Sequence, residues 1–321
     1  MITASHMLSM LAIFASGTRR RWAAAVAAVL LTGATGLSFA ADQQRTFRSP
    51  EEAAKALVAA AKSGDAKAMQ DILGPGSAEL LQSGDAVADR AGRERFVQAH
   101  GEANRLDRQG DAKAILLVGK DEWPLPIPIV KDAVGWRFDP KEGHEEILNR
   151  RIGRNELSAV QAVLAYADAQ REYYLRNPQG DKLLHYAQKL VSAPGKRDGL
   201  YFPTKAGEKP SPLGPLFASA KAEGYTKSEA GQPYAYHGYH YRILRAQGPS
   251  ARGGAYDYVA QGRMIGGFAL VAWPASYGNS GVMTFIVNHD GVVFEKDLGP
   301  DTAAAVKKIT RFSPDKSWKR L

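Results

Sequence analysis

Apolar residues recur along residues 143–177 at the three- and four-residue spacing of one helix face. No proline interrupts the stretch before Pro178. An unbroken helix of this length spans about 50 Å, since each residue adds about 1.5 Å. Such a helix needs other elements to pack against, so we predict a spine that joins two smaller α+β modules. The predicted buried stripe consists of Ile147, Leu157, Val160, Leu164, Ala167 and Tyr174.

The segment before the spine, residues 41–142, is predicted to form an N-terminal α+β module. Ser49, Pro50 and Glu52 make a helix start with an N-cap, a proline at the first position and a capping box. Further helical segments follow Asp65 and cover residues 77–81 and 89–101. The spacing then predicts strands at residues 112–118, 125–130 and 136–139. Pro126 and Pro128 cannot donate to a ladder, so the middle strand is expected at an edge of its sheet.

The region after the spine alternates loops with β patterns. Residues 181–191 have the spacing of a short amphipathic helix, and residues 192–215 form a loop rich in proline and glycine that apolar residues anchor. This loop contains the weak candidates for a ligand or partner site: Lys196, Arg197, Asp198 and Tyr201. The alternative is a charged turn that an aromatic residue holds in place.

The last part of the chain has the alternation of an antiparallel sheet that packs on the spine. Asp290-Gly291 is a tight-turn signal between its last two strands, and residues 301–310 are predicted to be helical. The fold class is therefore α+β, with a second module over residues 143–321. The predicted strands cover residues 239–244, 268–273, 282–288 and 292–296.

Residues 1–40 have the order of a secretory signal peptide. Three arginines, Arg19 to Arg21, precede an apolar run and the small-residue site that ends at Ala40. We expect cleavage after Ala40 and a periplasmic or secreted location. The alternative is an uncleaved anchor, although the apolar run is short for a membrane span. Met1, Met7 and Met10 are all possible starts.

Composition narrows the chemistry. The chain has 321 residues and no cysteine, which excludes disulfides, thiolate metal sites and cysteine nucleophiles. Its net charge of +9 comes from basic residues interspersed with acidic ones, which favours a solvated surface over nucleic-acid binding. His237 and His240 lack a third ligand, so we predict no metal site. Phosphate-loop, dinucleotide, zincin and serine-nucleophile motifs are absent, and we assign no catalytic residue and no cofactor.

Several segments carry resemblances. The opening SPEEAAKALVAAAKSGDAKAM and the ending GWRFD of the first module resemble nuclear-transport-factor-like or cystatin-like folds. The segments RNELSAVQAVLAYADAQREYY and GGFALVAWPASYGNSGVMTFIVNHDGVV are similar in pattern to the soluble part of type IV pilin-like proteins and pseudopilins. The segments EEILNRRIGRNELSAV and SAPGKRDGLYFP resemble an exported bacterial family catalogued as domain of unknown function 2950, which implies export but no activity.

The function that we expect is that of an exported, non-enzymatic binding or envelope-associated structural protein. Its expected partner is an unknown envelope protein or small ligand, with no nucleic acid and no membrane span after signal cleavage. One alternative is an enzyme or small-ligand binder that uses a pocket in the N-terminal module. A second alternative is a pseudopilin-like assembly subunit, which requires an exposed apolar patch along the spine.

Overall fold

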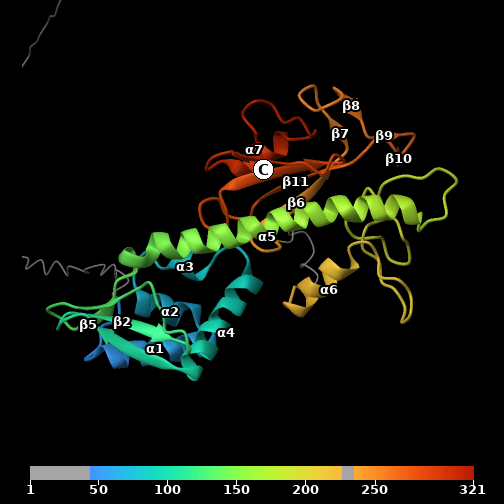
Figure 1. The fold of residues 1–321 in the computed structure, drawn as a ribbon. Coiled ribbons are helices and arrows are strands. Elements are labelled where there is room, and N and C mark those ends of the chain that lie inside the picture. The colour runs from blue at the N-terminus through green and yellow to red at the C-terminus, as the bar shows by residue number, and fades with distance from the viewer. Residues whose placement is uncertain (1–43, 226–234) are drawn as a thin grey trace, which may run out of the picture. The chain divides into compact units, whose positions relative to one another are not determined.

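The computed structural model describes residues 44–225 and 235–321, so the predicted signal peptide and its cleavage site lie outside the described residues. Residues Asp42–Leu321 form one compact unit. Its longest element is α5, which runs from Pro140 to Arg176 and is the long green helix of Figure 1. The predicted spine is confirmed, and it begins three residues earlier than expected.

Local chemistry explains both ends of α5. Asp139 is the N-cap and accepts a hydrogen bond from the backbone N–H of Lys141 at 3.2 Å, and Pro140 occupies the first turn, where its missing N–H costs nothing. At the other end Asn177 adopts the left-handed conformation with φ 44°, and its backbone N–H bonds to the carbonyl of Tyr173.

The predicted buried stripe of α5 is confirmed at Ala167, and Ile147 and Val160 pack half-buried against the two cores, but the prediction is wrong at Leu157 and Leu164. Leu157 is 69% exposed and Leu164 is 40% exposed, so neither belongs to the core. The helix instead buries smaller residues and two tyrosines against the second sheet, because small side chains let the helix backbone approach the strands closely. We therefore expect little loss of stability from truncating Leu164, which packs against little. The buried face comprises Ala159, Val163, Tyr166, Ala167, Gln170 and Tyr173.

The first module contains four helices and a small antiparallel sheet. The predicted start of the first helix is confirmed: Ser49 accepts from the backbone N–H of Glu52 at 3.2 Å, and the Glu52 side chain accepts from the N–H of Arg48 at 3.0 Å. Its core lies between the first two helices and the sheet. The helices are α1 (Pro50–Ser63), α2 (Ala66–Leu73), α3 (Ala78–Leu81) and α4 (Ala86–Glu102). The strands are β1 (Asn104–Arg108), β2 (Lys113–Val118), β3 (Trp123–Pro124), β4 (Ile129–Lys131) and β5 (Trp136–Phe138).

Two details of this sheet differ from the prediction. The strand β1, with the polar sequence NRLDR, was not predicted, and it pairs with β2 in the order β1-β2-β4-β5. The expected edge strand at 125–130 is also wrong. Pro126 and Pro128 lie in the bend between β3 and β4, where no ladder donor is needed. Only β4 remains a strand, and it pairs on both sides.

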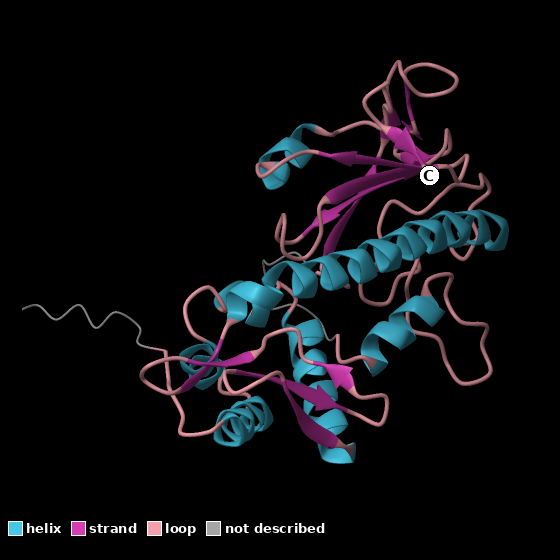
Figure 2. Cartoon of the chain, turned by 60° about the vertical axis from the view of Figure 1, so that its left-hand side comes forward, coloured by secondary structure: helices cyan, strands magenta, loops and turns pink. Residues whose placement is uncertain are grey.

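The second sheet is a five-stranded antiparallel meander in the order β14-β13-β12-β11-β6. As predicted, it packs on α5, mainly through β11 and β12 (Figure 2). Further short pairs, β7 (Ala246–Gln247) with β8 (Tyr256–Asp257) and β9 (Val259–Ala260) with β10 (Arg263–Met264), lie in the glycine-rich connection. The sheet strands are β6 (Tyr239–Leu244), β11 (Ala269–Pro274), β12 (Met283–Asn288), β13 (Val293–Asp297) and β14 (Lys319–Arg320), and helix α7 covers Thr302–Lys308.

The segment after α5 contains one correction. Residues 181–191 do not form the predicted amphipathic helix, because their backbone bonds go to distant partners instead. The N–H of Tyr186 bonds to the carbonyl of Met264, and the N–H of Tyr201 bonds to the carbonyl of Leu190, both at 2.8 Å. A short helix, α6 (Gly214–Ala222), follows the proline-rich loop. With antiparallel sheets and separate helices, the chain belongs to the α+β class, as predicted.

Candidate functional site

Asp85 is the most heavily bonded acidic side chain in the interior. It caps α4, where its Oδ1 accepts from the backbone N–H of Ala88 at 3.0 Å. Its Oδ2 accepts from the Tyr225 hydroxyl at 2.7 Å and from the N–H of Gly238 at 2.9 Å. Only 3% of the residue is exposed. Burial and the hydrogen bond to Asp85 both raise the pKa of Tyr225. The carboxylate therefore joins the first module to the approach of β6.

Arg151 makes a second connection, from the middle of α5. Its guanidinium donates to the backbone carbonyls of Glu79 and Leu80 and to the side-chain oxygen of Asn279. Asn279 in turn donates to the carbonyl of Gln82 at 2.9 Å. The Arg151 side chain is partly buried, and this burial lowers its pKa. It ties α3 and α5 to the loop before β12.

One turn further along α5, two more side chains hold the same loop. Asn155 donates to the carbonyl of Ser280 at 2.9 Å. Glu156 accepts from the backbone N–H groups of Val282 and Met283, both at 3.0 Å. Each of these contacts satisfies backbone that would otherwise be buried without a partner. We call Asp85, Arg151, Asn155, Glu156 and Asn279 the polar junction.

Asp89 lies beside the polar junction and has the perturbed pKa that is typical of functional carboxylates. Burial is the main cause and raises its pKa, while hydrogen bonds from Ser83 and the charge of Arg151 oppose the shift. Its Oδ2 accepts from the backbone N–H of Ser83 at 3.0 Å. Asp89 is not among the residues that line either of the cavities described below. The group thus has a structural partner, and it lies outside both described grooves.

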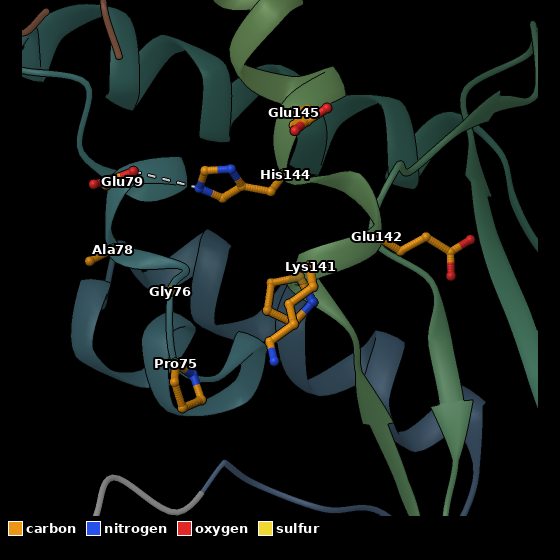
Figure 3. A pocket seen from close by; sticks show the side chains of 9 residues that line it. Pro75, Gly76, Ala78, Glu79, Lys141, Glu142, His144 and Glu145 are labelled. Atoms are coloured by element: carbon orange, nitrogen blue, oxygen red, sulfur yellow. Dashed lines mark ion pairs between the residues drawn. The ribbon is translucent and has the colours of Figure 1, made fainter. Parts of the chain in front are cut away.

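An open groove lies between α3 and the first turn of α5 (Figure 3). It has a volume of about 560 Å³ and is lined by Glu79, Lys141, Glu142, His144 and Glu145 together with Pro75, Gly76, Ala78 and Pro140. His144 points toward Glu79, and their Nε2 and Oε2 atoms lie 3.6 Å apart. Glu142 points away from His144 and pairs with Lys113. The lining has more acidic than basic side chains, in a protein that is basic overall.

A second open groove lies on the first module, between α1, α4 and the start of β1. Its volume is about 460 Å³, and His100 is the one histidine in its lining. Burial lowers the pKa of His100. Glu51 and Arg108, which also line it, form an ion pair at 2.6 Å. This groove holds paired charges around an apolar floor of Ala54, Val58, Leu106 and Leu116.

The four residues predicted as a weak ligand site are mostly engaged within the chain. Asp198 bonds to Lys189 at 2.6 Å and to the N–H of Ala193 at 2.9 Å, and these bonds, that of Lys189 first, lower its pKa. Arg197 pairs with Glu208 at 3.3 Å and lies over the ring of Phe202.

The remaining two candidates of this loop differ from each other. Tyr201 stacks on Phe217, with ring centroids 4.2 Å apart. Lys196 is exposed, and neither described groove includes it. Lys196, Arg197, Asp198 and Tyr201 lie in one loop. The contacts of Arg197, Asp198 and Tyr201 agree with the alternative, a charged turn held by an aromatic residue.

His237 and His240 do not come together as a ligand pair. His237 has φ 50°, and its Nε2 lies 3.3 Å from Glu223. The ring of His240 lies 5.5 Å from that of Trp273, and Arg242 lies over the same indole. Among residues 44–225 and 235–321, no three His, Cys, Asp or Glu side chains gather in a way that could hold a metal ion. Within the same ranges, no helix has the length and apolarity of a membrane span.

Comparison with known proteins gives one assignment. The chain belongs to the family described as "Protein of unknown function (DUF2950)", whose model matches residues 44–321. This confirms the family resemblance seen in the sequence. No curated protein matches the chain, and no solved structure does. The pilin-like pattern of the second half therefore stays a prediction.

Proposed function

We propose that this family member is an exported, non-enzymatic binding or envelope-associated structural protein. The proposal rests on the observation that the side chains of the polar junction bind the protein's own backbone. Its carboxylates, amides and guanidinium bind backbone groups from α3, α4 and the loops around β6 and β12. Side chains committed in this way hold a scaffold, and they are not available to bind a substrate or move its protons.

We assign the ligand-binding surface to the groove between α3 and α5. Its volume of about 560 Å³ is in the range of small-ligand sites, and its excess of carboxylates favours a cationic group. Glu145 has no hydrogen bond or ion pair within the described residues, so its charge is available to a partner. The same groove supports the second candidate, a small-ligand binder or enzyme of the N-terminal module, with His144 and Glu79 as its proton-transfer groups.

The test is recovery of the protein from the native envelope with whatever stays bound, followed by mass spectrometry and N-terminal sequencing. We expect a mature start at Ala41 and a bound partner that is lost in the Glu79→Lys, Glu145→Lys double variant. Lys196→Glu is the matched control, because Lys196 is exposed on another loop, and it should retain the partner.

Three results would contradict the proposal. An intact Met1 in the cytoplasm would overturn export. Retention of the partner by the double variant would overturn the groove. Turnover of a compound that His144→Gln abolishes, with the fold intact, would favour the enzyme instead.

A further inference from the structure

The solvent side of α5 has an ordered pattern. Its exposed positions recur at alternating spacings of three and four residues, which is the spacing of a coiled-coil seam. Leu157 and Leu175 are 69% and 77% exposed, and Leu164 is 40% exposed. Leu157 and Leu164 lie seven residues apart, which is one heptad, and Leu175 lies eleven residues further along the same face. Exposed apolar side chains that polar residues surround on one face are typical of an interaction surface. We call the following residues the exposed stripe: Arg154, Leu157, Gln161, Leu164, Asp168, Arg171 and Leu175.

The charges of the exposed stripe are arranged about its centre. Gln161 lies seven residues after Arg154 and seven residues before Asp168, and Leu157 and Leu164 lie on either side of it. Arg154 has no acidic partner among the described residues. Burial lowers the pKa of Arg154, and the nearby charge of Arg95 lowers it further. Asp168 is strongly exposed, and its one ion pair is the local contact with Arg171 at 2.9 Å. An acidic group that approaches Arg154 from outside would be stabilised.

We propose that a second copy of this chain docks on the exposed stripe, with the two α5 helices antiparallel and crossing near Gln161. This arrangement places the leucines of one copy against those of the other and Arg154 of each copy near Asp168 of the other. A parallel pairing would instead place Arg154 against Arg154 and Asp168 against Asp168, which is unfavourable. The charge pattern thus selects both the occupant and its direction.

The expected strength follows from the size of the surface. Two crossing helices bury less than the roughly 1,200 Å² of a standard interface, so the association is expected to be weak and dependent on concentration. Sedimentation velocity of the full chain from about 1 to 200 μM covers the range in which weak, transient interfaces assemble. We expect a dimer that forms toward the upper end and is lost in the Leu157→Glu, Leu164→Glu variant.

Leu183→Glu is the matched control, because Leu183 is 49% exposed and lies outside α5. It should associate as the wild type does. A wild type that stays monomeric throughout the range, or a stripe variant that associates like the wild type, overturns the proposal.

Cross-linking tests the geometry, and the absence of cysteine from the chain makes it clean. Gln161→Cys should form a covalent dimer with a short bis-maleimide, because Gln161 of one copy lies opposite Gln161 of the other copy. Asp168→Cys alone should not, since the two positions would lie about 21 Å apart along the helices. A mixture of Arg154→Cys and Asp168→Cys chains should cross-link. Self-linking of Asp168→Cys, or no linking of Gln161→Cys, contradicts the antiparallel pair.

Discussion

Replacing Asp85 with alanine is expected to lower the free energy of unfolding by about 3–5 kcal/mol. The substitution removes the cap of α4 and leaves the Tyr225 hydroxyl and the Gly238 N–H buried without an acceptor. A buried donor left without its acceptor costs about 1–3 kcal/mol, and loss of a cap costs about 1 kcal/mol. The losses of neighbouring contacts do not add fully, so the total lies in the lower half of their sum. Urea denaturation, followed by circular dichroism, measures the change.

Two controls separate the parts of this effect. Asp65 also caps a helix, with its Oδ1 2.9 Å from the N of Ala68, but it is exposed, and its side chain makes no other bond within the described residues. Asp65→Ala should therefore cost only about 1 kcal/mol. Asp85→Asn keeps a good cap and removes the acceptor for Tyr225 and Gly238, so it should fall between the two. Equal losses in Asp65→Ala and Asp85→Ala would mean that Asp85 does not join the modules.

Gly143→Ala is expected to cost about 3 kcal/mol, at the upper end of overpacking effects. A Cβ at this position would lie 2.2 Å from the carbonyl oxygen of Pro126 and 2.5 Å from its carbonyl carbon. Both atoms belong to backbone, which cannot turn aside as a flexible side chain can. The first turn of α5 would have to move away from the bend between β3 and β4. The urea midpoint should fall accordingly.

Gly153→Ala is the matched control on the same helix. A Cβ there meets nothing within 4 Å, and alanine is the better helix former, so the variant should be stabilised by about 0.5–1 kcal/mol. Opposite signs for the two substitutions are the expected result. If Gly143→Ala is as stable as the wild type, α5 does not pack closely on the Pro126 backbone.

The elements that local chemistry determines could be predicted from the sequence. Neighbouring residues alone determine the N-cap at Ser49, the proline-free run of α5 and the apolar, turn-bounded strands β6, β11, β12 and β13. The strand β1 was missed because its polar sequence lacks the alternation of a half-buried strand, and β2 supplies its partner from outside the segment.

The phase of α5 shows a different limit. Leucine is the more hydrophobic residue, so pattern reasoning favoured Leu157 and Leu164 over their neighbours. The second sheet instead accepts Ala159 and Val163, because small residues allow close packing. A search for one buried face overlooks the second face of α5, on which Leu157 and Leu164 are exposed at heptad spacing.

The polar junction could not be predicted, for a reason of distance along the chain. Asp85 meets Tyr225 across 140 residues, and Arg151 meets Asn279 across 128. Nothing near Asp85 in the sequence distinguishes it from other helix caps such as Asp65. The charged residues of the Lys196–Tyr201 loop suggested a ligand site in the sequence, but Asp198 pairs with Lys189 and Arg197 pairs with Glu208.

Hydrogen exchange along α5 is the most direct test of the central claim, which is that the polar junction joins the two cores into one scaffold along a continuous helix. Amide exchange reports the free energy of local opening. Amides at residues 150–156, between the two cores, are expected to exchange as slowly as those at 162–170, which the second sheet covers. Fast exchange confined to residues 150–156 would show a flexible linker between two independent modules, and it would contradict the account.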